Sequence, residues 1–246
     1  MQVVILCGGK GTRLRGEKDV IPKPLALVKG KPLILHIINI YRKYGHREFI
    51  LPLGFGGEYI KDYFYNYKWR NHDFSIDYGK EEVQIFKANE DFKVTFIDTG
   101  IGTNTGGRIK KIQSYINDED FMLTYGDGLS DINLDSLVAF HKEKGKIATV
   151  TGVNKISQYG IFSMNENNIA TIFDEKTSVM GVVNGGFFVL KKEVFNYIED
   201  IESCSFENST IKTLTTAGEM AVYMHDGLWI AVDTLKDLQK ANEEWQ

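Results

Sequence analysis

The sequence has little cysteine: its 246 residues include two, Cys7 and Cys204, and they do not form a Cys-x-x-Cys pair. This spacing excludes the usual cysteine pattern of zinc and thiol-redox sites, and sparse cysteine is typical of a reducing, cytoplasmic setting. Cys7 lies in an apolar run, which favours a packed thiol over a catalytic nucleophile. We therefore expect a cytoplasmic protein that does not use cysteine chemistry.

Long apolar runs and an excess of basic residues are also missing. No stretch approaches the roughly 18 apolar residues of a membrane helix, and the apolar start, 1–7, is too short and not basic enough for a signal peptide. The formal charge of −4 gives no sign of the basic surface that binds nucleic acid. The five histidines show no metal-ligand spacing. We expect no membrane and no nucleic-acid partner, so any phosphate chemistry must use basic residues that gather locally.

What the sequence does contain is an alternation of apolar strands and helices. Strands are predicted at 2–7, 48–53, 73–78, 93–99, 121–125 and 147–153, and the helices between them begin at Pro32 and cover 57–67, 106–116 and 134–144. This alternation predicts an α/β, Rossmann-like fold with a mostly parallel sheet and helices on both faces.

The second half of the chain predicts a small antiparallel extension of that sheet. It contains a hairpin of 160–164 and 169–174, strands at 182–190, 221–224 and 228–231, and helices at 191–199, 209–217 and 234–245. No linker or internal repeat interrupts the sequence. We therefore expect a single domain over residues 1–246.

A glycine-rich basic loop follows the first predicted strand. It consists of Gly8, Gly9, Lys10, Gly11, Thr12 and Arg13, and a Pro-Lys-Pro segment centred on Lys23 comes after it. Ligands of open parallel sheets bind beyond the carboxyl ends of the strands, and glycines let backbone N–H groups approach a phosphate closely. Lys10, Arg13 and Lys23 could neutralise a triphosphate, Arg13 through forked contacts. The alternative is a flexible turn with solvated side chains, but the gathered cations favour a phosphate site.

Two familiar phosphate motifs do not fit this loop. A Walker loop requires Gly-Lys-Ser/Thr, whereas Lys10 is followed by Gly11. A dinucleotide fingerprint that began at Gly9 would require glycine at position 14, which is Leu14. The strand ending near Leu53 also lacks the acidic residue that binds a ribose in that class. The loop therefore predicts a different kind of nucleotide site.

Further segments complete a pattern that the glycine loop begins. They are Asp-Thr-Gly at 98–100, Thr-Gly-Gly-Arg at 105–108, Leu-Thr-Tyr-Gly-Asp-Gly at 123–128, Asn-Gly-Gly-Phe-Phe at 184–188 and Asp-Thr-Leu at 233–235. Together with 8–13 and 22–24, they resemble the sugar-1-phosphate nucleotidyltransferases along nearly the whole chain, and among these the glucose-1-phosphate cytidylyltransferases. The resemblance implies an enzyme that joins CMP from CTP to a small phosphorylated acceptor and releases pyrophosphate.

Two aspartates are candidates for a metal site. Asp127 follows an apolar strand between two glycines, a position suited to ligating Mg²⁺. Asp233 is either a second ligand or the N-cap of the last helix. The resemblance implies that both aspartates hold Mg²⁺, and that the catalytic residues are Arg13 on the leaving group, Lys23 on the α-phosphate, and Asp127.

The resemblance also divides the remaining site residues between nucleotide and acceptor. For the nucleotide it implies Leu6, Cys7, Gly8, Gly9, Lys10, Gly11, Thr12, Thr103, Arg108 and Gly126, with Thr103 like a base-contacting threonine. For the acceptor it implies Glu175, Lys176 and Asn184. If Glu175 and Lys176 do not bind the acceptor, they are simply the charged end of a hairpin. Homo-oligomers are common in the resembling family, so self-association is one outcome that the resemblance allows.

The acceptor side departs from the glucose enzymes at Thr177, where their pattern has proline, and at the segments 178–183 and 205–208, while the nucleotide side is intact. Glucose 1-phosphate is therefore the first choice of acceptor, and a non-sugar phosphate such as phosphorylated glutamine, used in capsule phosphoramidate biosynthesis, is the second. A nucleotide sensor without catalysis is the alternative from another class. The joint presence of Arg13, Lys23, Asp127 and Asp233 argues against it. A dehydrogenase is disfavoured because the cofactor fingerprint is missing.

Overall fold

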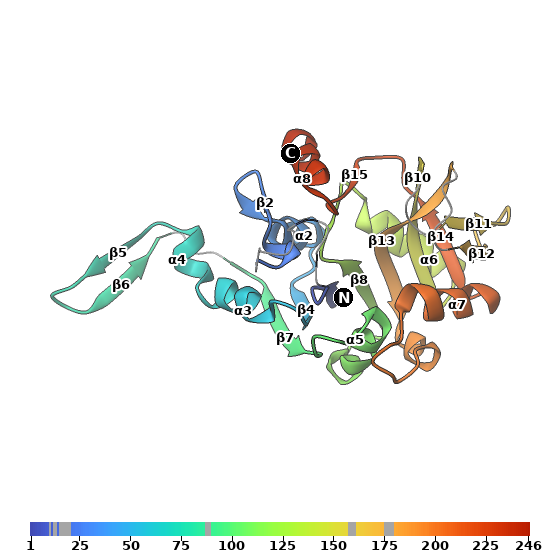
Figure 1. Cartoon of the computed structure of the whole chain (residues 1–246), viewed down its shortest axis with the longest axis horizontal. Helices are drawn as coiled ribbons and strands as arrows, with labels where there is room; N and C mark the ends of the chain where they lie inside the picture. The colour runs from blue at the N-terminus through green and yellow to red at the C-terminus, as the bar shows by residue number, and fades with distance from the viewer. Residues whose placement is uncertain (10, 12–13, 15–20, 87–89, 157–160, 175–179) are drawn as a thin grey trace.

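The central feature of the computed structural model is one twisted sheet (Figure 1). The structure describes residues 1–246 except 10, 12–13, 15–20, 87–89, 157–160 and 175–179. Within the described residues nine strands form this sheet, in the order β12-β11-β13-β8-β1-β4-β7, with β10 beside β13 and β14 beside β10. The predicted α/β fold class is confirmed.

The parallel half of the sheet carries the N-terminal segments. It consists of β1 (Val3–Leu6), β4 (Glu48–Leu53), β7 (Lys93–Asp98) and β8 (Asp120–Tyr125). β1 is central and pairs in parallel with both β4 and β8. All four of its side chains are buried, as expected for a strand that is covered on both faces.

Helices cover both faces of the sheet. Val3 and Ile5 belong to one core cluster and Val4 and Leu6 to another, because successive strand residues point to opposite faces. The first cluster includes seven buried residues of α2 (Leu33–Lys43), and the second includes Ile109 of α5 (Thr105–Lys111). The other helices are α3 (Gly57–Tyr65), α4 (Tyr67–Asn71), α6 (Leu134–Lys144), α7 (Lys212–Thr216) and α8 (Leu235–Glu244).

The other half of the sheet is mixed. Its long strand β13 (Met180–Lys191) pairs antiparallel with β8, with β10 (Ala148–Ile156) and with β11 (Ile161–Met164). β12 (Ala170–Asp174) pairs with β11 as the predicted hairpin, and β14 (Met220–Met224) runs parallel to β10. The antiparallel extension is therefore larger than the sequence predicts.

Several short elements lie outside this sheet. They are the 3₁₀ turns η1 (Lys23–Leu25), η2 (Gln113–Tyr115) and η3 (Lys192–Tyr197), the π-helical turn η4 (Phe206–Ile211), and the strand pairs β2 (Leu27–Val28) with β3 (Lys31–Pro32) and β9 (Gly128–Ser130) with β15 (Trp229–Ala231). The helix predicted at 191–199 is thus a 3₁₀ segment. The one predicted at 209–217 is a π-helical turn followed by α7.

The strand predicted at 73–78 is placed differently from the expectation. β5 (Phe74–Asp77) pairs with β6 (Glu82–Ile85), which the sequence did not predict, and the two form a separate hairpin that projects from the body (Figure 1). Its residues are almost all exposed. The helix predicted at 57–67 is also interrupted at Asn66, between α3 and α4. In the described part of the chain, no helix is long and apolar enough to cross a membrane.

Candidate functional site

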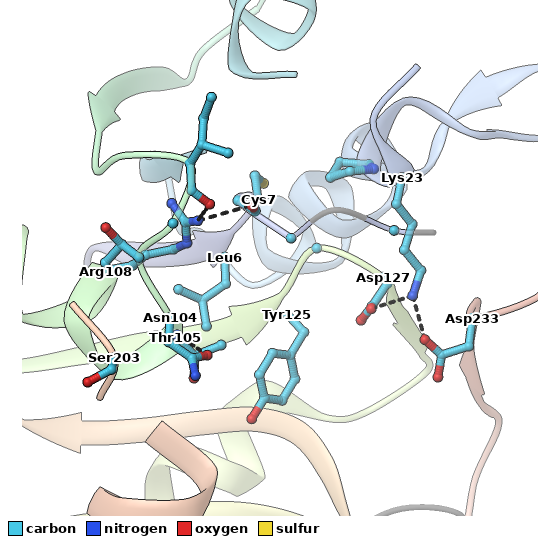
Figure 2. A pocket seen from close by; sticks show the side chains of 18 residues that line it. Leu6, Cys7, Lys23, Asn104, Thr105, Arg108, Tyr125, Asp127, Ser203 and Asp233 are labelled. Atoms are coloured by element: carbon cyan, nitrogen blue, oxygen red, sulfur yellow. Dashed lines mark hydrogen bonds and ion pairs between the residues drawn. The ribbon is translucent and has the colours of Figure 1, made fainter. Parts of the chain in front are cut away.

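A cavity of about 660 Å³ opens at the carboxyl ends of β1 and β8 (Figure 2), where open α/β sheets bind their ligands. It is lined by Leu6, Cys7, Gly8, Gly9, Gly11, Lys23, Pro24, Ile101, Gly102, Thr103, Asn104, Thr105, Arg108, Tyr125, Gly126, Asp127, Ser203 and Asp233. The structure therefore brings most of the predicted nucleotide and metal residues to one place. Lys10, Thr12, Arg13, Glu175 and Lys176 lie outside the described residues.

Two aspartates and a lysine meet at one end of the cavity. Lys23 Nζ lies 2.7 Å from Asp127 Oδ2 and 2.6 Å from Asp233 Oδ1 (Figure 2). Burial alone would lower the pKa of Lys23, but the two carboxylates raise it above its usual value. The ammonium group is therefore charged, and it offsets part of the negative charge of the pair.

A short strand pair explains how residues so distant in the sequence meet. Asp127 precedes β9 and Asp233 follows β15, and these strands pair with Gly128 opposite Ala231. The amide of Val232 also donates to the carbonyl of Asp127 at 2.9 Å. This ladder brings the two carboxylates to the same ammonium group.

The interpretation of Asp233 as a helix N-cap is wrong. The N-cap of α8 is Thr234, whose hydroxyl accepts from the amide of Asp237 while the Asp237 carboxylate accepts from the amide of Thr234, a capping box. The Asp233 carboxylate faces Lys23 instead.

The carboxylate pair fits a divalent cation that brings other ligands with it. Asp127 Oδ2 and Asp233 Oδ1 already converge on one cationic nitrogen. Mg²⁺ usually takes one or two carboxylates together with phosphate oxygens and water. No group of three or more candidate metal-ligating side chains occurs in the described residues. An ion on this pair would therefore complete its shell with water or substrate oxygens.

Arg108 holds the backbone next to the glycine loop through hydrogen bonds. Its guanidinium is buried and donates to the carbonyl of Leu53 at 2.8 Å, to the Thr99 hydroxyl at 2.6 Å and to the carbonyl of Gly8 at 3.1 Å. A Cβ atom at Gly8 or at Gly54 would overlap this guanidinium. Arg108 therefore fixes the backbone of the cavity wall, and glycine at these two positions makes room for it.

The nucleotide-side residues Thr103 and Cys7 both lie in the cavity wall. Thr103 is buried, and its hydroxyl donates to the carbonyl of Thr99 at 2.5 Å. The hydroxyl proton is therefore not available for a hydrogen bond to a nucleotide base. Burial, followed by the charge of Asp127, raises the pKa of the Cys7 thiol far above its usual range. Cys7 is therefore a neutral packed thiol, as the sequence predicts.

Asn184 reaches the site through a neighbour. It is not among the lining residues, but its Nδ2 donates to the hydroxyl of Tyr125 at 3.3 Å, and Tyr125 lines the cavity. The Tyr125 hydroxyl in turn donates to Glu207 Oε1 at 2.7 Å. Neither residue is predicted as a site residue from the sequence. Tyr125 lies inside the Leu-Thr-Tyr-Gly-Asp-Gly segment, and Glu207 lies in the segment 205–208, which departs from the family pattern.

The second large cavity does not have this chemistry. It has a volume of about 740 Å³ and lies near α2 and the C-terminus, and its walls include Ser130 and Asp131 but not the glycine loop or the carboxylate pair. His225 lies beside these two residues, but both approach the same nitrogen, Nε2, at 3.1 and 3.0 Å. A hydrolytic triad needs its serine and its acid on different ring nitrogens, so this cluster is not one.

The chain is similar to several known proteins. The family model described as nucleotidyl transferase matches residues 2–246. A probable glucose-1-phosphate cytidylyltransferase of Bacillus subtilis is 49% identical over 245 residues, covering 100% of this chain and 96% of the relative. The glucose-1-phosphate cytidylyltransferase of Salmonella typhimurium is 34% identical, with the same coverage. The crystal structure of HddC from Yersinia pseudotuberculosis matches with a TM-score of 0.78 at 24% identity, covering 100% of this chain and 99% of that one, which confirms the fold.

Proposed function

Since the chain belongs to the nucleotidyl transferase family, we propose that it transfers CMP from CTP to glucose 1-phosphate, giving CDP-glucose and pyrophosphate. Two relatives that match over the whole chain carry the name of this activity. The observation that carries the proposal is the meeting of Lys23 with Asp127 and Asp233 at the end of a cavity bounded by a glycine loop. A binding sensor would not need this charge arrangement.

The reaction needs positioning and charge balance more than proton transfer. An oxygen of the acceptor's phosphate attacks the α-phosphorus of CTP, and the bond from that phosphorus to the pyrophosphate oxygen breaks. A phosphate monoester dianion is already a nucleophile, so no general base is required. Lys23 would bind the α-phosphate and Arg13 the leaving pyrophosphate. Asp127 and Asp233 would hold Mg²⁺, which supplies positive charge for the phosphate oxygens.

The cavity divides between the two substrates. We assign the nucleotide to the wall formed by Leu6–Gly9, Gly11, Thr103, Arg108 and Gly126, and to Lys10 and Thr12 of the same loop. Glu175, Lys176 and Asn184 would bind the acceptor, the glutamate through hydroxyl groups and the lysine through phosphate. A neutral cavity wall at Cys7 suits a base better than a charged thiolate would.

The experiment is an assay of pyrophosphate release with purified protein and Mg²⁺. CTP, UTP and GTP are each tested with glucose 1-phosphate, other sugar 1-phosphates and phosphorylated glutamine. The proposal expects the fastest turnover with CTP and glucose 1-phosphate. Faster turnover with phosphorylated glutamine would instead assign the enzyme to capsule phosphoramidate biosynthesis. Nucleotide binding without any pyrophosphate release would favour the sensor.

We further propose that the chain acts as a single cytoplasmic domain and supplies an activated sugar for polysaccharide synthesis of the capsule or lipopolysaccharide type. Both cysteines are free and buried, in keeping with a reducing compartment. A cell-fractionation blot tests the compartment, and accumulation of glucose 1-phosphate in a deletion strain tests the place in metabolism.

We also propose that the chain associates with a second copy of itself through the region 59–86. Eight of the fifteen exposed large hydrophobic residues of the described chain lie there. On the β5–β6 hairpin, Ile76 pairs with Val83 on a face that is left uncovered, and the two are 44% and 60% exposed. A lone two-stranded hairpin is marginally stable in water. Basic α4 and the acidic hairpin lie in the same region, so two copies can be self-complementary.

The mass in solution tests this association. Light scattering after size exclusion should give more than the 27.9 kDa of one chain, and Ile76→Asp with Val83→Lys should reduce it to that value. The control changes Ser75→Asp with Gln84→Lys, a pair on the opposite face of the same hairpin, and should leave the assembly intact. A monomeric wild type, or an assembly that survives the first variant, refutes the proposal.

A further inference from the structure

Glu207 is a hydrogen-bond centre behind the cavity wall. Its Oε1 accepts from the Tyr125 hydroxyl at 2.7 Å, and its Oε2 accepts from the hydroxyls of Thr105 at 2.6 Å and Ser205 at 3.0 Å. Tyr125 ends β8, Thr105 begins α5, and Glu207 lies in the π-helical turn η4. Such turns often occur at functional sites. The carboxylate therefore joins two cavity-lining residues from different elements.

The negative charge sets the direction of the hydrogen bonds that follow. A carboxylate can only accept, so the Tyr125 proton is committed to Glu207. The Tyr125 oxygen then accepts from Asn184 Nδ2 at 3.3 Å, and Asn184 Oδ1 accepts from the amide of Gly186 at 2.9 Å. The Tyr125 hydroxyl is thus a donor to Glu207 and an acceptor from Asn184.

Packing holds the same chain of contacts in place. Gly186 has φ of +78°, and a Cβ atom there would lie 2.6 Å from Cδ2 of Tyr125. The Tyr125 ring is therefore pressed against the backbone turn that orients Asn184. The Tyr125 side chain thus contacts Asn184 through its hydroxyl and the following turn through its ring.

We propose that Glu207 is a positioning residue that fixes the orientation of the Asn184 amide through Tyr125, and thereby sets which oxygen of the phosphorylated acceptor Asn184 binds. With Nδ2 directed at Tyr125 and Oδ1 at Gly186, one N–H of Asn184 is left for an acceptor oxygen. The proposal rests on the proposed function in using a phosphorylated acceptor and in assigning Asn184 to it.

The test compares KM for the acceptor with KM for the nucleotide. Glu207→Gln keeps the size of the side chain but replaces one accepting oxygen with a donor. It should raise KM for the acceptor about 10-fold or more and leave KM for CTP within about twofold, the scale of one charged hydrogen bond. Tyr125→Phe should do the same, and the double variant should be no worse than Tyr125→Phe, since both act through one path.

The matched control is Glu202→Gln, an exposed carboxylate of the preceding loop that pairs with Lys111 at 2.6 Å. It should change neither KM. Multiplied losses in the double variant, or equal rises of both KM values in Glu207→Gln, overturn the proposal. The kinetics use the acceptor that wild type turns over fastest in the panel, so failure of glucose 1-phosphate alone does not affect this test.

A measurement without substrate covers the case of no turnover. In ¹⁵N spectra of the ligand-free protein, the side-chain amide protons of Asn184 should exchange slowly with water in wild type and in Glu202→Gln. They should exchange at least about tenfold faster in Glu207→Gln and Tyr125→Phe. Equal exchange rates in all four proteins would overturn the proposal that Glu207 fixes the Asn184 amide. This result does not depend on whether the proposed reaction is correct.

Discussion

Replacement of Lys23 by methionine removes the ammonium group that joins Asp127 and Asp233. The two carboxylate oxygens are then no more than about 5 Å apart, because each lies within 2.7 Å of the same nitrogen, and at an effective ε near 20 their repulsion is about 3 kcal/mol. Their side chains are 32% and 9% exposed, so solvent screens part of this. We expect the variant to lose about 2 kcal/mol of unfolding free energy.

A divalent cation should reverse this loss, since it can take the place of the ammonium group. In thermal unfolding without nucleotide, Lys23→Met should melt about 4–8 °C below wild type, given about 2–4 °C per kcal/mol for a chain of this size. Mn²⁺ should raise its Tm and leave that of wild type nearly unchanged. Adding Asp233→Asn should recover part of the Tm without metal, because it removes one of the repelling charges.

The pH dependence follows from the sign of the shift. The pKa of Lys23 is raised, so its stabilising charge is present throughout the neutral range and is lost only as pH rises through that raised value. The Tm difference between variant and wild type should therefore be constant from about pH 6 to 9. Lys142→Met, an exposed site on α6, is the control. If Lys23→Met melts with wild type and gains nothing from Mn²⁺, the bridging role is refuted.

Three further changes test other parts of the site. Asp127→Asn should lower turnover about 100-fold, measured as pyrophosphate release, because it removes one preorganised charge; near-normal turnover of folded protein would reject its role. Arg108→Lys should cost about 2 kcal/mol in chemical denaturation, since a lysine cannot reproduce the fork that serves Leu53 and Gly8; unchanged stability would contradict this. Cys7 should resist iodoacetamide in native protein because its thiol is buried and neutral; rapid inactivation would show otherwise.

Local signals predicted the regular elements well. The bounds of β4 and α6 agree with the prediction. For α6 the reason is local: Asn133 caps its first turn, and Gly145 ends it with a left-handed φ of +64°. The sequence left the N-cap interpretation of Asp233 open, because Asp233 and Thr234 are both good N-caps and only the Asp237 carboxylate decides between them.

Pairing between distant segments was harder to predict. The alternating pattern at 73–78 indicates a strand but not the sheet to which it belongs, and its partner β6 is only four residues long. The approach of Asp127 to Asp233 depends on the β9–β15 ladder, and the predicted strands did not include β9. The resemblance supplied that pair. The role proposed for Glu207 has little local signal, because Tyr125 and Thr105, its two partners in the cavity wall, lie 82 and 102 positions away.

The burial of Arg108 beneath Gly8 and Gly54 constrains how this wall of the site can change over evolutionary time. A Cβ atom at either glycine would overlap the guanidinium in its present place, so Arg108 would have to give up the hydrogen bonds that hold it there. A shorter residue at position 108 would have to come first, and it would remove the guanidinium from the Thr99 hydroxyl and from the carbonyls of Leu53 and Gly8, which would be left with the donors Thr99 and Phe55. Each single step thus passes through a weakened protein, so the three positions are expected to be replaced together or not at all.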